Sequence, residues 1–352
     1  MIRLRRVSIL VRFRRWLFIA LTLPAAVPEA LAGQPTLGLF EEPQPGALRG
    51  PVGSEPFDAR EALNGATSSP EQCATIEGAY WVDVDGQGDC IRSYAHGLQT
   101  GENPVVMVYL AGDVMLRNAH GIRYIGSSYK AASPAMLTRA LERWSDAAGI
   151  PAIQIARPGF HGSSGDHNQR RHPREIELVD GALDAVKHRY RVKQFILAGQ
   201  SGGAHVAASL LNRRSDIEAA VLASGVLSTR RLAAMWENRR KISGKLLYDA
   251  ASFYDPIDEL DRIRKAPPPR IFVLSDPEDR SVFFSTQLHY VRLLRRAGYT
   301  PQHVYLHAPD RQRHGLADFA RLAASLLAQH RSDRAVRAAL SELELQQFAG
   351  QN

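Results

Sequence analysis

Cysteine is scarce in this sequence, and long apolar runs are missing. The 352 residues include only two cysteines, Cys73 and Cys90, which excludes a small scaffold held mainly by disulfides. A membrane-spanning helix needs about 20 consecutive apolar residues. The best candidate, residues 16–27, is shorter and is interrupted by Pro24. No internal repeat is present either, which excludes a repeat architecture.

Acidic residues are in deficit, but the excess of positive charge lies mostly at one end. The formal net charge is +8, and six arginines against one glutamate in residues 1–32 supply +5 of it. The remaining +3 is a mild excess without a basic stripe, so no nucleic-acid partner is expected. With 45% hydrophobic residues, the chain is long enough and apolar enough to bury a large core.

Residues 1–32 have the three parts of a secretory signal peptide. Arginines form a basic head, residues 16–27 form a short apolar segment, and Ala-Leu-Ala at 30–32 is a small-residue cleavage site. Arg14 and Arg15 loosely match a twin-arginine signal, so the sequence leaves the export route open between Sec and twin-arginine. We expect a periplasmic or secreted protein that is not attached to a membrane after cleavage; an uncleaved anchor is the alternative.

Both cysteines lie in the part that we expect to be exported. In an oxidising compartment a close pair most simply forms a disulfide, and a closed loop of about 15 residues contributes up to about 3 kcal/mol. Two strand-like runs flank the turn residues 85–88, which predicts a hairpin stapled by Cys73 and Cys90. Residues 33–72, rich in Pro and Gly, are expected to form a tether or an arm on the surface.

From residue 104 onward, apolar strand-like runs alternate with segments of helical periodicity. Strands are expected at 104–110, 151–157, 193–199, 217–224, 269–275 and 302–308, and the main helices at 133–149, 173–190, 203–214, 283–298 and 314–330. This alternation requires crossover connections, which give a mostly parallel sheet with helices on both faces. Residues 226–267, basic at their start, are a possible small cap, and residues 331–352 are an expected surface helix.

The stretch Gly199-Gln200-Ser201-Gly202-Gly203 lies between an expected buried strand and a helix rich in small residues. A dinucleotide-binding turn that began at Gly199 would need glycine where Ser201 stands, and a phosphate-binding P-loop needs a lysine that is missing. The pattern G-x-S-x-G instead predicts a sharp turn that exposes Ser201 as a nucleophile at the carboxyl edge of the sheet. The glycines give strand and helix the room to approach each other.

A nucleophilic serine needs a base, and in α/β-hydrolases this base is a histidine that comes last in the chain, after an acid. His314 is the expected base because it falls in a loop between the last strand and the last helix. His307, at the end of a strand, is the alternative. The other later histidines are expected to be surface or packing residues; they are His289, His303 and His330.

The base in turn needs an acid that orients it. The loop after the strand at 269–275 offers Asp276, Glu278 and Asp279. Asp279 is the expected acid because Val282 completes a D-x-x-V pattern that recurs in this fold. Asp276 and Glu278 are the alternatives, otherwise read as exposed or capping carboxylates.

Acyl transfer also requires hydrogen-bond donors for the oxyanion of the tetrahedral intermediate. The backbone N–H of Gly202, directly after the nucleophile, is the first expected donor. The second is expected from the loop after the strand at 104–110, and the sequence does not choose between the amides of Gly112 and Asp113. The same residues also fit a plain strand-to-helix turn.

Residues 158–172 form a loop with several histidines and arginines. His161, His167 and His172 are too loosely spaced to predict a metal site, so we expect a solvated loop near the mouth of the active site. Arg170 and Arg171 are expected to be solvated as well, with contact to an acidic substrate group as the alternative. No metal or organic cofactor is implied.

The second half of the chain resembles the catalytic domain of the prolyl oligopeptidase and dienelactone hydrolase branch of the α/β-hydrolase superfamily. The residues that carry the resemblance are 199–203, the stretch 254–282 and the pair His314-Gly315. It implies one α/β-hydrolase domain, placed at 73–330, that acts as a serine hydrolase on a small ester or a short peptide. An ester is favoured because there is no room for a propeller domain. A catalytically inactive binding module on the same fold is the alternative of another class.

Overall fold

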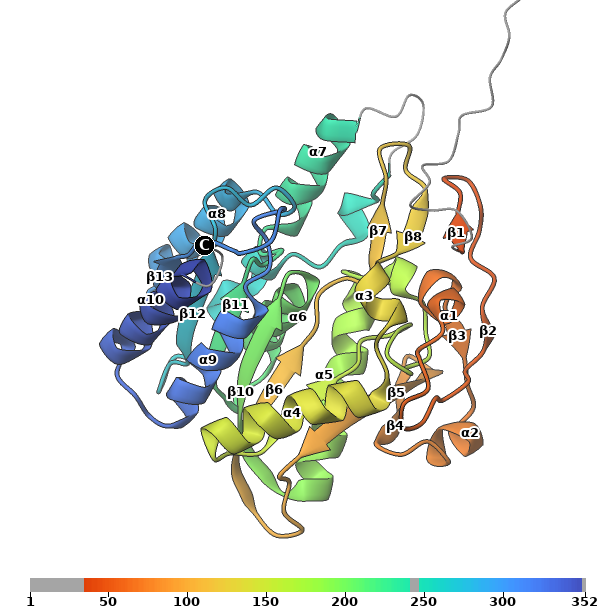
Figure 1. Ribbon diagram of the computed structural model, residues 1–352, viewed down its shortest axis with the longest axis horizontal. Coiled ribbons are helices and arrows are strands. Elements are labelled where there is room, and N and C mark those ends of the chain that lie inside the picture. Colours follow the sequence, from red (N-terminus) through yellow and green to blue (C-terminus); the bar gives the residue numbers. More distant parts are fainter. Residues whose placement is uncertain (1–34, 241–246, 350–352) are drawn as a thin grey trace, which may run out of the picture. The chain divides into compact units, whose positions relative to one another are not determined.

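An eight-stranded sheet forms the centre of the part that the computed structural model describes, residues 35–240 and 247–349 (Figure 1). The expected signal peptide lies outside these residues. Six adjacent strands are parallel, and the two strands at one edge are antiparallel, so the mostly parallel sheet predicted from the sequence is confirmed. In spatial order the strands are β13 (Gln302–Tyr305), β12 (Arg270–Ser275), β11 (Ile217–Ala223), β10 (Val192–Gln200), β6 (Asn103–Leu110), β9 (Ala152–Ile155), β5 (Gln87–His96) and β4 (Ala79–Val84).

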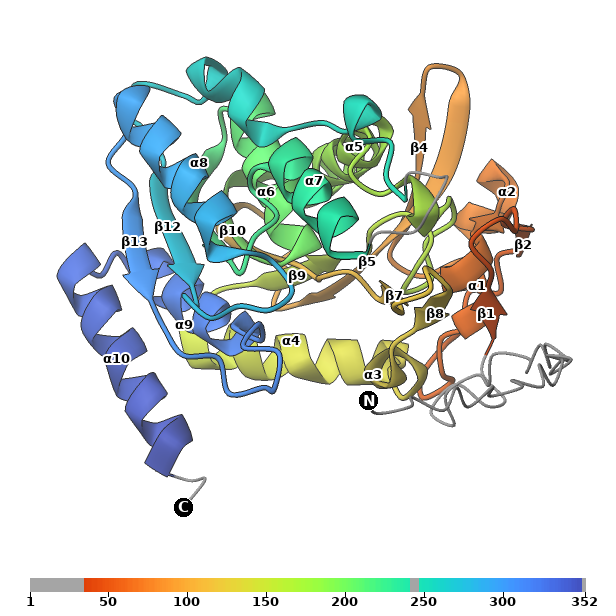
Figure 2. The same cartoon turned by 90° about the horizontal axis from the view of Figure 1, so that it is seen from above.

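Helices cover both faces of the sheet, as Figure 2 shows. One face carries α4 (Pro134–Ala148), α9 (Ala317–Ala328) and, outside α9, α10 (Asp333–Ala349); the other carries α5 (Pro173–Tyr190), α6 (Gly202–Arg213) and α8 (Phe284–Arg296). Successive side chains of β10 point to opposite faces. Ile196 and Ala198 therefore join one core and Phe195 and Leu197 the other. All four are fully buried, which explains the continuous apolar run of this strand.

The strand order reverses at the middle of the sheet. From β6 the chain steps outward to β9, and it then returns to place β10 on the opposite side of β6. Ligand sites of open parallel sheets lie outside the carboxyl ends of the strands at such a reversal. The loops that follow β6 and β10 therefore meet where a site is expected.

The predicted hairpin is present, but it belongs to the main sheet. β4 and β5 pair antiparallel through the two-residue turn Asp85-Gly86, and β5 then pairs with β9. Both turn residues have positive φ, 53° for Asp85 and 78° for Gly86, as a tight hairpin turn requires. The sheet thus extends further toward the N-terminus than the alternation of strands and helices indicated.

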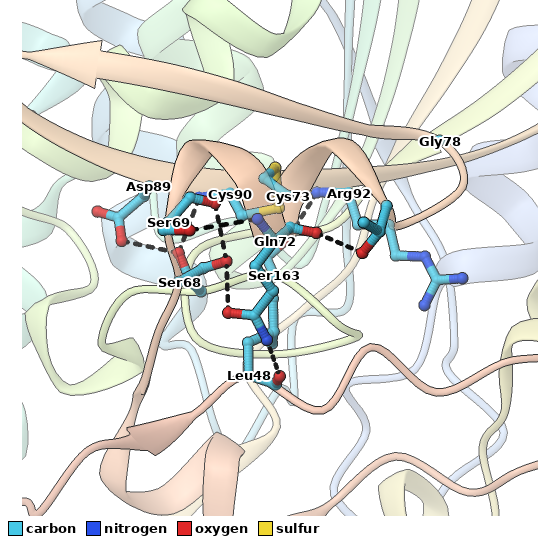
Figure 3. The surroundings of a disulfide bond; sticks show 12 residues. Leu48, Ser68, Ser69, Gln72, Cys73, Gly78, Asp89, Cys90, Arg92 and Ser163 are labelled. Carbon is cyan, nitrogen blue, oxygen red and sulfur yellow. Dashed lines mark hydrogen bonds between the residues drawn. A yellow bond between two sulfur atoms is a disulfide. The ribbon is translucent and has the colours of Figure 1, made fainter.

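The disulfide between Cys73 and Cys90 is present (Figure 3). The pairing predicted from the sequence is therefore confirmed. The bond joins β5 of the hairpin to the short helix α2 (Pro70–Ala74), which precedes the hairpin. The neighbouring Gln72 donates from Nε2 to the carbonyl oxygen of Leu48 at 2.6 Å, so α2 also holds the chain before it.

The segment between residue 35 and α2 packs against the domain as an arm, so the tether alternative does not describe it. Leu37, Phe57 and Leu63 are buried in the same core cluster as residues of the main sheet. The small elements of this region and of the loop after β6 are β1 (Thr36–Leu37), β2 (Gly46–Ala47), α1 (Ala59–Asn64), β3 (Ala66–Thr67), β7 (Met115–Arg117), β8 (Arg123–Ile125) and α3 (Ser127–Lys130). β1, β8 and β7 form a separate antiparallel sheet.

The possible cap at 226–267 begins with α7 (Thr229–Arg240). Two short 3₁₀ segments follow it, η3 (Ala250–Ser252) and η4 (Pro256–Arg262), and a third, η2 (His167–Gln169), lies before α5. Within the described residues, no helix combines the length and the apolar character that crossing a bilayer requires.

Replacing both cysteines, Cys73→Ser with Cys90→Ser, is expected to lower the free energy of unfolding by about 3 kcal/mol, because the bond restrains a loop in the unfolded chain. The two residues are 17 positions apart in the sequence. Urea denaturation followed by circular dichroism measures the loss. Wild-type protein treated with a reductant serves as the control and should match the variant. Equal stability of the oxidised wild type and the variant would contradict the expectation.

Candidate active site

Ser201 stands in the turn between β10 and α6, and this turn has an unusual backbone. Its φ is 56° and its ψ is −116°, a combination that costs energy for a residue with a side chain. The neighbouring glycines make the turn possible: a Cβ on Gly199 would lie 2.6 Å from the Cα of Ala204, and one on Gly203 would overlap the carbonyl of Leu110. The backbone N–H of Ser201 donates to Ala223 O at 2.9 Å, which ties the turn to β11.

His314 and Asp279 are brought together from two different loops. His314 Nδ1 lies 2.8 Å from Asp279 Oδ2. Because an ionised carboxylate only accepts hydrogen bonds, Nδ1 carries the proton and Nε2 is left with a lone pair. The other carboxylate oxygen, Asp279 Oδ1, accepts from the backbone amides of Ser281 and Val282, each at 2.8 Å. The acid is therefore fixed by its own loop.

The loop of His314 is held from two sides. The backbone N–H of His314 donates to Asp310 Oδ1 at 2.9 Å, and its carbonyl accepts from Gln200 Nε2 at 2.7 Å. Gln200 Oε1 in turn accepts from the amide of Leu316 at 3.2 Å. The residue directly before Ser201 thus clamps the loop of the histidine. The G-x-S-x-G pattern leaves this residue unspecified, so sequence reasoning missed its role.

The alternative acids and base have other partners. Asp276 is fully buried and accepts from Arg313 Nε and from the amide of Ala308, both at 2.8 Å. The side chain of Glu278 is 70% exposed. His307 Nδ1 pairs with Glu344 Oε1 at 2.8 Å on α10. None of these three side chains lines the pocket at Ser201.

A pocket of about 650 Å³ contains both Ser201 and His314 in its wall. It opens at the carboxyl ends of β6 and β10, where the strand order reverses. The wall includes residues of the loop after β6, of β7, of α7 and of the loop after β12; they are Gly112, Asp113, Met115, Leu116, Arg117, Trp236, Arg239, Arg280, Ser281 and Val282, among others.

The expected oxyanion donors lie around Ser201. Gly202 begins α6, and the first amides of a helix have no partner within the helix. On the other side, a Cβ on Gly112 would lie 3.3 Å from Ser201 Cβ, so the loop after β6 passes close to the serine. This loop leads into β7, not into a helix, which corrects the reading of a strand-to-helix turn.

The carboxylate of Asp113 lies in a buried cluster of arginines. Its Oδ1 is 3.0 Å from Arg157 Nη1, and its Oδ2 is 3.3 Å from Arg170 Nε and pairs also with Arg171. Burial by itself would raise the pKa of Asp113, but the guanidinium groups of Arg171, Arg157 and Arg170 outweigh it and hold the pKa well below its usual value. Asp113 therefore stays ionised. Arg170 and Arg171 are buried, which corrects the expectation that they are solvated.

Arg157 connects this cluster to α5. Its Nε donates to Glu175 Oε1 at 2.8 Å, and its Nη1 donates to the carbonyl of Ala111 at 3.1 Å. The side chain has no exposed surface. Sequence reasoning missed this residue, although an arginine at the end of an apolar strand, directly after Ile155-Ala156, is a signal of a buried ion pair.

The loop 158–172 is also largely buried, not solvated as expected. His161 and His167 are 7% and 0% exposed. Burial, aided by Arg157, lowers the pKa of His161 to about 3, and the same two causes hold that of His167 well below its ordinary value. Both histidines are neutral at physiological pH. Among the described residues, no group of three or more His, Cys, Asp or Glu is arranged to hold a metal ion.

No protein-family model matches the chain, and no curated protein is significantly similar in sequence. The structure of the esterase Pf2001 from Pyrococcus furiosus superimposes with a TM-score of 0.50 at 14% identity, over 75% of this chain and 92% of that chain.

Two further solved structures superimpose less closely. The esterase Est1E from Butyrivibrio proteoclasticus with ferulic acid bound gives a TM-score of 0.47 at 14% identity, over 77% of this chain and 100% of that chain. An acylaminoacyl peptidase from Pyrococcus horikoshii gives 0.44 at 12% identity, over 64% of this chain and 36% of that chain. The likeness to the Pf2001 structure, together with the strand order, shows that this chain has the α/β-hydrolase fold.

Arg157→Met is expected to lower the free energy of unfolding by about 3–5 kcal/mol, because it leaves the buried carboxylate of Glu175 and the mostly buried carboxylate of Asp113 without their shared partner. Urea denaturation at pH 7 measures the loss. Lys193→Met is the matched control, since Lys193 pairs with Glu102 at 2.7 Å on the surface, where both side chains are exposed. The expectation is wrong if the two variants lose equal amounts of stability.

Proposed function

We propose that the protein is an exported serine hydrolase that cleaves a small ester through an acyl-enzyme intermediate. The observation that carries the proposal is the meeting of three features in one place. Ser201 stands on a strained turn, it shares a pocket with His314, and His314 is hydrogen-bonded to Asp279. Backbone strain of this kind is kept where it serves a function.

In the proposed reaction, Ser201 Oγ attacks the acyl carbon of the ester while His314 Nε2 takes the hydroxyl proton. Asp279 holds the imidazole in the tautomer that leaves Nε2 free and stabilises the positive charge that forms on the ring. The tetrahedral intermediate collapses, His314 returns the proton to the leaving alkoxide, and the acyl group remains on Ser201. Water, deprotonated by the same histidine, then releases the acid.

The amide of Gly202 and an amide of Gly112 or Asp113 are proposed to hold the oxyanion. Loss of one such donor costs about 2.7–4 kcal/mol of transition-state stabilisation in a protease where it was measured. The ion pairs of Asp113 with Arg157 and Arg171 fix its side chain, and the bond from Arg157 to the carbonyl of Ala111 fixes the backbone before Gly112. Both support an oxyanion hole that is organised before substrate binds.

Export is the second part of the proposal. The sequence of residues 1–32 supports it, and so does the disulfide between Cys73 and Cys90, since such bonds persist in oxidising compartments. We propose that the mature protein works in the periplasm or outside the cell.

Ser201→Ala is expected to abolish both labelling by a fluorophosphonate probe and ester hydrolysis, because the probe reacts only with an activated serine. Labelling is read by intact-protein mass, and hydrolysis by release of p-nitrophenol. His314→Ala should lower kcat by about 10⁴-fold or more. His307→Ala is the matched control and should keep near wild-type activity, because His307 pairs with Glu344 on the surface. Labelling that persists in the Ser201→Ala protein would exclude this serine, and an unlabelled wild type would favour an inactive binding module.

Short-acyl p-nitrophenyl esters are expected to be cleaved readily, and dipeptidyl nitroanilides far more slowly or not at all. An ester has the better leaving group, while an amide also requires a site that grips the flanking peptide. A parallel panel on one enzyme preparation, compared by kcat/KM, measures the difference. Efficient nitroanilide cleavage beside feeble ester cleavage would overturn the esterase assignment in favour of a peptidase.

A further inference from the structure

Arginines gather in the wall of the pocket that contains Ser201. Five of them line it, and Asp113 is the one carboxylate among the described residues of the wall. The five are Arg117, Arg170, Arg171, Arg239 and Arg280. They come from β7, from the loop before α5, from α7 and from the loop after β12, so the positive charge surrounds the pocket from several elements.

Two of these arginines form ion pairs within the protein. Arg170 and Arg171 both pair with the carboxylate of Asp113. Each has less than a tenth of its side chain exposed. Their charges hold the loop after β6 and are not free to bind a ligand.

Arg239 and Arg280 are in a different position. Both are exposed, and neither forms an ion pair with a carboxylate among the described residues. Arg239 Nη1 donates to the carbonyl of Arg280 at 2.7 Å, and Arg280 Nη1 donates to the carbonyl of Arg311 at 3.4 Å. A carbonyl orients a guanidinium group but does not neutralise its charge.

Arg239 and Arg280 are also connected to the loops that carry Asp279 and His314. Arg280 directly follows Asp279, and its backbone N–H donates to Gln312 O, in the loop of His314, at 2.9 Å. Arg239 lies on α7, which is tied to the loop of Asp279 because Trp236 donates from Nε1 to Ser281 O at 2.9 Å. The two charges are therefore fixed at the wall of the pocket by the elements that carry Asp279 and His314.

We propose that Arg239 and Arg280 select a substrate with an anionic group, a carboxylate or a phosphate, at a distance from the ester that is cleaved. This inference rests on the proposed ester hydrolysis at Ser201. Guanidinium groups bind both kinds of anion through charge-assisted hydrogen bonds. The half-buried rings of Trp236 and Tyr248, whose centroids are 5.4 Å apart, provide an apolar wall for the part of the substrate between the anion and the ester. The uncompensated positive charge also steers anionic substrates toward the pocket.

A pair of substrates that differ only in charge tests this specificity. Mono-p-nitrophenyl adipate carries a terminal carboxylate, and the p-nitrophenyl ester of adipic acid monoamide is its neutral, nearly isosteric counterpart. The wild type is expected to prefer the carboxylate by about tenfold or more in kcat/KM. The preference should shrink as salt is raised from 20 to 500 mM, because screening weakens exposed charges.

The variants Arg239→Gln and Arg280→Gln should each reduce the ratio of kcat/KM for the two substrates, and the double variant should bring it close to one. The ratio is taken within each variant, so a general loss of fold or activity cancels. Arg334→Gln, on the exposed surface of α10 and away from the pocket, is the matched control and should keep the wild-type ratio.

Calorimetric titration of adipate and of inorganic phosphate into the Ser201→Ala protein provides a readout that does not depend on hydrolysis. Binding that is weakened by Arg239→Gln in that background supports the anion site, and the tighter of the two probes identifies its chemistry. Binding of adipate or phosphate without hydrolysis of either ester by the wild type would reject the proposed ester cleavage and leave the anion site standing. A ratio near one in the wild type, or one that is unchanged in both arginine variants, would overturn the specificity while ester cleavage stands.

Discussion

The mostly buried carboxylate of Asp113, in the wall of the pocket, is the point to which the surroundings of the candidate site are tied. It pairs with Arg157, just after the end of β9, and with Arg170 and Arg171 from the loop before α5, so two segments that follow β9 are fixed to the loop after β6. Breaking such a cluster on one side leaves an uncompensated buried charge. The same carboxylate lies against α6 where it begins: a Cβ on Gly202 would overlap Asp113 Oδ1. The position of the loop beside Ser201 is therefore a consequence of charge pairing as much as of sheet packing.

A second constraint acts on the other side of the pocket, through hydrogen bonds to backbone carbonyls. Gln200 clamps the loop of His314, Trp236 and Arg239 of α7 donate to the loop of Asp279, and the amide of Arg280 joins that loop to the carbonyl of Gln312. α7 belongs to the segment that interrupts the alternation of strands and helices. This insertion lines the pocket with Trp236 and Arg239, and its contacts also support the loop of Asp279.

Periodicity and turn chemistry made most of the fold predictable. The apolar run of β10, the glycines around Ser201 and the Pro at the start of α5 each depend on neighbours in sequence, and the predicted elements lie where these signals stand. The meeting of Asp279 with His314 followed from chain order and loop position. The sequence-based predictions that were wrong share another cause. Residues 158–172 look solvated in sequence because they are polar, and the burial of Arg170 and Arg171 depends on Asp113, which comes from the loop after β6. The place of the β4–β5 hairpin in the sheet likewise depends on a pairing with β9 that no local pattern encodes.

The net charge of the sequence does not reveal where positive charge gathers in the fold. Outside residues 1–32 the chain has only a mild excess of positive charge, and most of its arginines have carboxylate or carbonyl partners. The fold nevertheless brings five arginines and one carboxylate to the wall of a single pocket. Because fields in a cleft with low-dielectric walls are focused rather than averaged over the surface, a nearly balanced protein can still present a strongly positive site. Local geometry, and not the total charge, therefore sets the electrostatic field in the pocket beside Ser201.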